Sequence, residues 1–147
     1  MAATTPTEMT GLQMMKALIA SGVQPPMGRT LKFSLVEVEE GRAVFEGEPG
    51  PEVYNPIGTV HGGYAATLLD SACACAVQSK LAADQTLSTL ELKVAFHKAL
   101  TAKAGKVLAE ARVLSIGQQV AFCEATLRGH SGRLFASATS TLLIMKR

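Results

Sequence analysis

The segment from Asn55 to Asp70 holds the residues that could do chemistry. Two glycines, Gly62 and Gly63, follow His61 and begin a run of small apolar residues at helical spacing. The first N–H groups of a helix have no partner within the helix, and a glycine leaves them open to a ligand. Such N–H groups can stabilise a developing oxyanion. On the motif alone, an oxyanion site and an ordinary tight turn into a helix both fit.

Asp70 is the only charged side chain between Gly62 and Ser79. A carboxylate in the middle of an apolar helix is costly to bury unless it is paired or functional. No Lys or Arg lies three or four residues away to pair with it. Asp70 therefore either accepts a hydrogen bond from another element or acts as a base, and the residue alone fits both hypotheses.

The spacing of the two candidate groups has a geometric consequence. Gly62 and Asp70 are eight positions apart, which is about 12 Å along a helix axis. Both groups of one chain cannot touch the same reacting carbonyl. If both are functional, the carbonyl lies between the helix start of one subunit and Asp70 of another, which predicts at least a homodimer with two-fold symmetry.

The elements that position these residues follow from hydrophobic spacing. Helical spacing predicts a buried helix from residue 62 to about 81 and a short amphipathic helix over residues 10–21, which Thr10 caps and Gly22 ends. Alternating apolar residues predict strands at 31–38, 42–48, 89–97, 106–113, 119–128 and 134–145. This order predicts an α+β architecture in which an antiparallel sheet curls around one buried helix.

Composition narrows the class of protein. The 147 residues are 48% apolar and 18% charged, which excludes intrinsic disorder. The net charge of +2, with no Trp and no basic run, argues against a nucleic-acid partner. The uncharged residues 53–69 include Pro, Asn, His and Gly and are not a membrane span. Residues 1–11 lack the basic and apolar regions of a signal peptide, so we expect a cytoplasmic location.

The cysteines and histidines do not have the spacing of metal ligands. Cys73 and Cys75 are two positions apart, Cys123 lies far along the chain, and the three histidines are more than thirty residues apart. We therefore expect small buried thiols in a reducing compartment and no metal site.

Taken together, these features resemble a known family. The order of elements, Asn55 in a loop, His61-Gly62-Gly63 and an acidic residue nine positions after the histidine are similar to the hotdog-fold acyl-CoA thioesterases, in particular the PaaI-like (phenylacetate-degradation type) branch. The resemblance covers residues 28–145. It implies a sheet of about six strands wrapped around one long central helix, with residues 1–27 as an N-terminal helical extension and residues 28–147 as a single hotdog domain.

The resemblance also implies roles for individual residues. Asp70 would be the general base that activates water, or the nucleophile that forms a mixed anhydride. The Gly62 N–H would polarise the thioester carbonyl, and His61 and Asn55 would hold the oxyanion loop or orient the carbonyl and water. Thr89 would help to place the attacking water, although an ordinary strand threonine fits as well. The expected substrate contacts are Gly63, Tyr64, Leu68 and Phe96.

The implied reaction is hydrolysis of an acyl-CoA or aryl-CoA thioester, which needs no metal or organic cofactor because a thioester is already activated. Dimers of the family commonly pair into homotetramers. The sequence departs from relatives at Phe96-His97-Lys98-Ala99, where they often have Phe-Leu-Arg-Pro, and at Gly117-Gln118, where they often have Lys or Arg after the glycine. The contacts to the coenzyme A phosphates are therefore undetermined, and the available cations are Lys98, Lys103 and Arg128.

Three other functions stay open. A non-catalytic acyl-CoA binding module would have little use for a carboxylate beside the carbonyl. A hotdog-fold hydratase or dehydratase pairs a histidine directly with a carboxylate, whereas His61 and Asp70 are nine positions apart. A purely structural oligomer would leave Asp70 and the paired glycines without a purpose.

Overall fold

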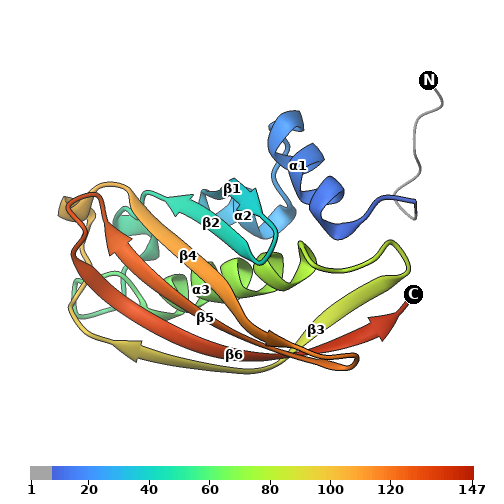
Figure 1. The fold of residues 1–147 in the computed structure, drawn as a ribbon. Helices are drawn as coiled ribbons and strands as arrows, with labels where there is room; N and C mark the ends of the chain where they lie inside the picture. Colours follow the sequence, from blue (N-terminus) through green and yellow to red (C-terminus); the bar gives the residue numbers. More distant parts are fainter. Residues whose placement is uncertain (1–7) are drawn as a thin grey trace.

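The computed structural model describes residues 8–147 and has a six-stranded antiparallel sheet curled around helix α3 (Gly62–Gln78) (Figure 1). The strand order in the sheet is β1-β2-β4-β5-β6-β3. The strands are β1 (Phe33–Glu39), β2 (Arg42–Gly47), β3 (Gln85–Phe96), β4 (Val107–Ile116), β5 (Val120–Gly129) and β6 (Leu134–Lys146). The predicted α+β architecture with one long central helix is confirmed.

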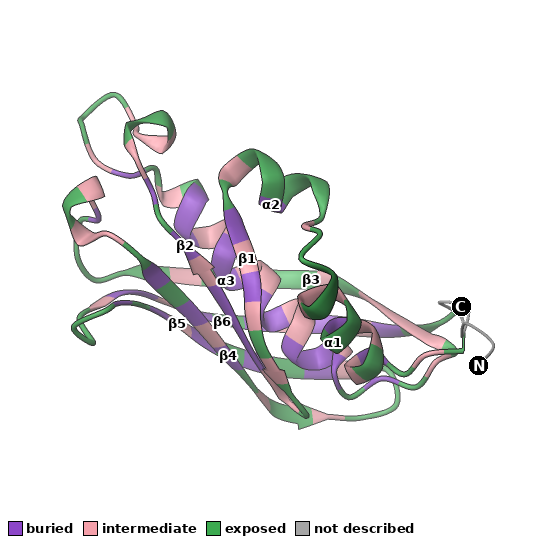
Figure 2. Ribbon diagram, turned by 90° about the horizontal axis from the view of Figure 1, so that it is seen from above, coloured by how far each residue is buried: buried purple, intermediate pink, exposed green. Residues whose placement is uncertain are grey.

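Helix α3 and the strands around it form the core. The helix side that faces the sheet carries mainly small and medium apolar residues, and the strands over it present alanines such as Ala109, Ala111 and Ala121. Figure 2 shows the buried residues gathered on α3 and on the strands beside it. Small side chains on both surfaces let the sheet approach the helix closely, and each fully buried leucine contributes about 1.5–3 kcal/mol.

The opposite side of α3 is less covered than the sequence predicts. Ala66, Asp70 and Ala74, one turn apart along the helix, are only half-buried. The sequence predicts a buried helix, and the structure buries only the side of α3 that faces the sheet. The sheet of one chain leaves this stripe of α3 partly open.

The two edges of the sheet differ. Helix α1 (Gly11–Ser21) packs beside β1, which is one edge strand. The other edge is β3, and its outer side has no strand partner among residues 8–147. The alternation of residues 90–96 predicts one shared apolar face, but a bulge between Thr89 and Glu91 removes Leu90 from it and leaves Leu90 59% exposed. The bulge bends the strand next to Asp70's neighbour Thr89.

The N-terminal region agrees with the prediction in α1 and differs after it. Thr10 and Gln13 form a capping box, and Gly22 ends the helix with φ 68°. The strand predicted from residue 31 begins at Phe33, because α2 (Pro26–Leu31) precedes it. Pro25 precedes α2 and Pro26 is its first residue, where a missing N–H needs no partner, so the two prolines begin a helix.

The expected boundary between the N-terminal extension (residues 1–27) and the hotdog domain (residues 28–147) falls inside α2. The absence of a signal peptide is predicted from residues 1–11, and residues 1–7 of this segment lie outside the described residues. The structure also contains two short 3-10 helices, Pro51–Val53 and Ala102–Ala104. Over residues 8–147, no helix combines the length and the apolar character that crossing a membrane would require.

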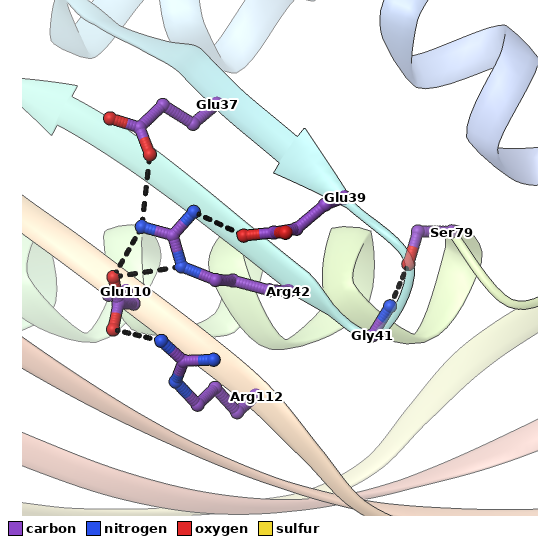
Figure 3. Close-up of polar contacts among 7 residues, drawn as sticks. All are labelled: Glu37, Glu39, Gly41, Arg42, Ser79, Glu110 and Arg112. Carbon is purple, nitrogen blue, oxygen red and sulfur yellow. Dashed lines mark hydrogen bonds and ion pairs between the residues drawn. The ribbon is translucent and has the colours of Figure 1, made fainter.

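Polar contacts join the first strands on the outer face of the sheet (Figure 3). Arg42 of β2 is 18% exposed and pairs with Glu37 at 2.9 Å, Glu39 at 2.9 Å and Glu110 at 2.7 Å. The hydrogen bonds with Glu110 and Glu37 raise the pKa of the Arg42 guanidinium above its usual range. One cation thereby joins β1, β2 and β4.

A second contact fixes the β1–β2 turn to the end of α3. The Ser79 hydroxyl accepts a hydrogen bond from the Gly41 N–H at 2.8 Å and donates one to the Ala76 carbonyl at 2.6 Å. Ser79 is buried, so these bonds satisfy a hydroxyl that would otherwise be costly to bury.

The docking of α1 onto the end of α3 gives a test of the fold. The Gly11 N–H donates to the Leu81 carbonyl at 2.9 Å, and a Cβ on Gly11 would overlap the Gln78 carbonyl oxygen. We expect Gly11→Ala to displace α1 and to lower the free energy of unfolding by about 1–3 kcal/mol. Urea denaturation followed by circular dichroism measures this loss.

The matched control is Gly117→Ala, because a Cβ there makes only an ordinary contact of 3.7 Å with the Val120 carbonyl oxygen. Its stability should equal or slightly exceed that of the wild type. Equal midpoints for both variants would show that α1 does not depend on this close approach.

Candidate functional site

The N-terminus of α3 offers one free backbone donor. His61 caps the helix, and its Nδ1 accepts the Gly63 N–H at 2.7 Å. Because Nδ1 accepts, the neutral imidazole carries its proton on Nε2. The Gly62 N–H has no hydrogen-bond partner among the described residues. Of the two glycines, Gly62 therefore has the N–H that is available to a ligand.

Phe96 lies directly against Gly62. A Cβ on Gly62 would come within 2.9 Å of Phe96 Cζ and 3.1 Å of Cε1. The absence of a side chain at this position is thus required by packing as well as by access to the N–H. Phe96 remains 60% exposed, so its ring forms an open apolar wall beside the free donor.

Asn55 holds the loop that leads into the helix. Its Oδ1 accepts the Ile57 N–H at 3.1 Å and the Thr59 N–H at 3.2 Å, and its Nδ2 donates to Thr59 Oγ1 at 2.9 Å. Both ends of the amide are used inside a single turn. Over residues 8–147 no hydrogen bond joins Asn55 to Gly62.

Asp70 accepts a hydrogen bond from β3. The Thr89 hydroxyl donates to Asp70 Oδ1 at 2.9 Å, and Oδ2 has no hydrogen-bond partner within residues 8–147. Thr89 lies opposite Leu142 in the ladder, on the face that covers α3. Asp70 therefore accepts a hydrogen bond from another element, which is one of the two possibilities that the sequence allows. Its second carboxylate oxygen stays free, and Asp70 lies on the half-buried side of the helix.

The predicted site residues form two groups within one chain. Gly62, Gly63, His61 and Phe96 gather at the start of α3, whereas Asp70 and Thr89 lie two turns further along. The helix is unbroken between Gly62 and Asp70, so the separation of about 12 Å holds.

Two predicted substrate contacts lie apart from both groups. Tyr64 is 3% exposed and Leu68 is 0% exposed, and both side chains pack against Gly47 of β2. The Tyr64 hydroxyl is buried without a hydrogen-bond partner in the described chain. Burial, helped by the charge of Glu52, raises the pKa of Tyr64 to about 12. The phenol is therefore protonated at neutral pH and does not act as a base.

The thiols near Asp70 are also unsuited to nucleophilic attack. Cys73 and Cys123 are buried, and the neighbouring Cys123 thiol together with burial raises the pKa of Cys73. Burial raises the pKa of Cys75 to about 12. The thiolate is the reactive form of cysteine, and the raised pKa of Cys73 and of Cys75 disfavours it. In residues 8–147, no cluster of three or more His, Cys, Asp or Glu side chains could hold a metal ion.

Sequence reasoning missed one residue of this region. The Tyr54 hydroxyl accepts the Ala102 N–H at 2.8 Å and so joins the loop before α3 to the segment after β3. No motif or spacing marks this tyrosine, because its partner is a backbone group 48 residues away.

The arrangement supplies the parts needed to attack a carbonyl. A free N–H at a helix start can stabilise negative charge on oxygen. A carboxylate with one oxygen oriented by a hydroxyl and one oxygen free can accept a proton or attack carbon.

Comparison with known proteins agrees with this chemistry. The model of the thioesterase superfamily matches residues 57–136. A 1,4-dihydroxy-2-naphthoyl-CoA hydrolase of Listeria monocytogenes is 28% identical over 118 residues, which are 80% of this chain and 94% of that protein.

Solved structures share the fold. A thioesterase family protein of Silicibacter pomeroyi has a TM-score of 0.81 at 25% identity and covers 93% of this chain and 99% of its own. A phenylacetic acid degradation-related protein of Ralstonia eutropha has a TM-score of 0.78 at 26% identity, with 88% and 98% covered. Because the family match spans more than half of the sequence, the chain belongs to the thioesterase superfamily and is a hotdog-fold thioester hydrolase.

Proposed function

We propose that this protein hydrolyses an acyl-CoA or aryl-CoA thioester to a free acid and coenzyme A. The observation that carries the proposal is the pairing of Thr89 with Asp70, which orients one carboxylate oxygen and leaves the other free on the half-buried side of α3. The free Gly62 N–H at the start of the same helix provides the oxyanion donor. The Listeria relative is named for a CoA thioester.

In the general-base form of the reaction, Asp70 takes a proton from water while the water oxygen bonds to the thioester carbon. The carbonyl oxygen becomes an oxyanion that the Gly62 N–H stabilises. When the intermediate collapses, the C–S bond breaks and the thiolate leaves with the proton held by Asp70. In the nucleophilic form, Asp70 itself bonds to the carbon, the thiolate leaves, and water then hydrolyses the mixed anhydride.

The supporting residues act around these two groups. Asn55 and His61 hold the loop and the first turn of α3 through the contacts described above. Thr89 orients Asp70 and the attacking water. Phe96 and Gly63 line the path of the substrate beside the oxyanion donor. Tyr64 and Leu68, which the resemblance implies as substrate contacts, pack on Gly47 and support α3 from the core side.

If Gly62 and Asp70 both act on one carbonyl, their separation of about 12 Å, estimated from the helical rise, requires a site shared between two chains. The carbonyl then lies between Gly62 of one protomer and Asp70 of its partner in a two-fold homodimer, which has two sites. Support comes from the half-buried stripe of α3 and from the unpaired edge of β3, whose Leu92 and Val94 are half-buried and whose Phe96 is exposed. We further propose that two dimers form a homotetramer and that the enzyme works in the cytoplasm.

The relatives support the proposed substrate class. We place the protein in the PaaI-like branch, and the Ralstonia structure named for phenylacetic acid degradation supports this choice. The substrate of the Listeria relative is a naphthoyl-CoA, which is an aryl thioester. A test panel therefore needs both aryl-CoA and straight-chain acyl-CoA substrates.

The first prediction concerns Asp70. Asp70→Asn is nearly isosteric but removes the carboxylate that serves as base or nucleophile, so kcat should fall by about 10²–10⁴-fold with the fold retained. Free-thiol release from the substrate panel measures the activity. Glu91→Gln, which removes an exposed carboxylate of β3 that lies on the outer face, is the control and should keep full activity.

Two outcomes separate the alternatives. Full activity in Asp70→Asn would refute the mechanism. Inactivity of the wild type on every substrate would favour the binding module, and direct measurement of acyl-CoA affinity would then follow.

The second prediction isolates the Gly62 N–H. Gly62→Ala keeps the N–H but adds a Cβ against Phe96, whereas Gly62→Pro adds a comparable Cβ and removes the N–H. Position 62 is the first residue of α3 and His61 is extended at ψ 134°, so proline fits the backbone. The proline variant should lose a further 10²–10³-fold or so in kcat relative to the alanine variant. Equal kcat values for the two variants would exclude the N–H as the oxyanion donor.

The third prediction tests the shared site. Dimers of Asp70→Asn and dimers of Gly62→Pro are each inactive, but a mixed dimer has one intact site. After unfolding and refolding of an equal mixture, about a quarter of wild-type activity should return, because half of the dimers are mixed and each has one working site of two. Light scattering should give at least twice the 15.4 kDa of one chain. No recovery from the mixture, or an active monomer, would contradict a site built from two chains.

A further inference from the structure

The loop that delivers Gly62 is a small closed hairpin. Tyr54 and Val60 form an antiparallel bridge, and the His61 N–H donates to the Val53 carbonyl at 2.8 Å. The Asn55 N–H donates to the Thr59 carbonyl at 2.8 Å across the turn. The direction of the Gly62 N–H is set by the residues immediately before it, so the placement of this hairpin decides where the oxyanion donor points.

Two hydrogen bonds attach the hairpin to the segment that follows β3. The Val60 N–H donates to the Leu100 carbonyl at 2.8 Å, and the Ala102 N–H donates to the Tyr54 hydroxyl at 2.8 Å. The first bond is between backbone groups and does not depend on side-chain type. In the described chain, the Tyr54 hydroxyl provides the one side-chain hydrogen bond between the hairpin and residues 97–105.

The anchoring segment is itself well fixed. Leu100 is buried, and the N–H groups of His97 and Lys98 donate to the Phe135 carbonyl at 2.8 and 3.2 Å. The same segment begins beside Phe96, whose ring touches Gly62. The chain from Phe96 to Ala102 therefore contacts the helix start at one end and holds the hairpin at the other.

We propose that Tyr54 is a positioning residue for the oxyanion donor: its hydroxyl, held by the Ala102 N–H, fixes the hairpin so that the Gly62 N–H meets the carbonyl oxygen as charge develops. This inference rests on the proposed thioesterase function. The physical reason is that an oxyanion donor acts only when it is held in place before the reaction, and a displacement of about 1 Å can cost about a hundredfold in rate.

The test compares Tyr54→Phe with a matched control. Tyr54→Phe removes only the hydroxyl, and we expect kcat to fall by about tenfold to a hundredfold with a nearly unchanged KM. Ser79→Ala also removes a hydroxyl that binds a backbone N–H, but at the far end of α3 (Figure 3), so it should lose stability without a change in kcat. A KM increase at constant kcat in Tyr54→Phe would overturn the positioning role.

A second variant removes the other partner of the same bond. Ala102 is the first residue of a 3-10 helix and Thr101 before it is extended, so Ala102→Pro fits the backbone and deletes only the N–H. It should reproduce the kcat loss of Tyr54→Phe, and the double variant should be no worse than either single variant. Additive losses would contradict a shared hydrogen bond, and this variant keeps the test valid if Tyr54→Phe does not fold.

Hydrogen exchange separates failure of this inference from failure of the proposed function. The amides of Val60 and His61 should exchange faster in Tyr54→Phe than in the wild type or in Ser79→Ala. If the wild type releases no thiol from any substrate, the thioesterase proposal fails. Faster exchange in Tyr54→Phe would then still show that the Tyr54 hydroxyl holds the hairpin in place. Unchanged exchange, or unchanged kcat in an active enzyme, would overturn the assignment.

Discussion

Close packing of α3 inside the sheet is the constraint on which the site depends. Small residues on the helix and on β4 and β5 bring the sheet against one side of α3 and make the helix a rigid rod. The spacing of Gly62 and Asp70 on that rod is therefore fixed at about 12 Å by the helical rise. A flexible loop could fold to bring two groups together, but this helix cannot. The chemistry must accordingly be shared between chains or confined to one of the two groups.

At each of the two groups, one polar atom is hydrogen-bonded within the described chain and the polar atom next to it is free. His61 takes the Gly63 N–H and leaves the Gly62 N–H free, and Thr89 takes Asp70 Oδ1 and leaves Oδ2 free. The backbone of α3 fixes the direction of the free Gly62 N–H, and the hydrogen bond from Thr89 restricts rotation of the Asp70 carboxylate. In the proposed reaction, the free Gly62 N–H and the free Asp70 oxygen are the two positions that meet the substrate.

The sequence predicts features set by neighbouring residues better than features that depend on contacts with residues far away in the chain. The long helix, the Thr10 cap and the order of strands are set by neighbouring residues, so spacing and side-chain type are sufficient. The bulge at Leu90 depends on the match between β3 and β6, and the Tyr54 contact depends on a backbone N–H 48 residues away. Tyr64 and Leu68, which the resemblance implies as substrate contacts, pack against Gly47 of β2, a contact that depends on how the sheet covers the helix.

Strand β3 links the two groups. It runs along α3 in the opposite direction, so Thr89 reaches Asp70 while Phe96 reaches Gly62. In a two-fold dimer with shared sites, these two contacts belong to different sites, because Gly62 and Asp70 of one chain serve different carbonyls. A shift of β3 along the helix would disturb the carboxylate of one site and the oxyanion donor of the other together. The pairing of β3 with β6 over nearly its whole length opposes such a shift, and the bulge after Thr89 fixes the register where it matters most, beside Asp70.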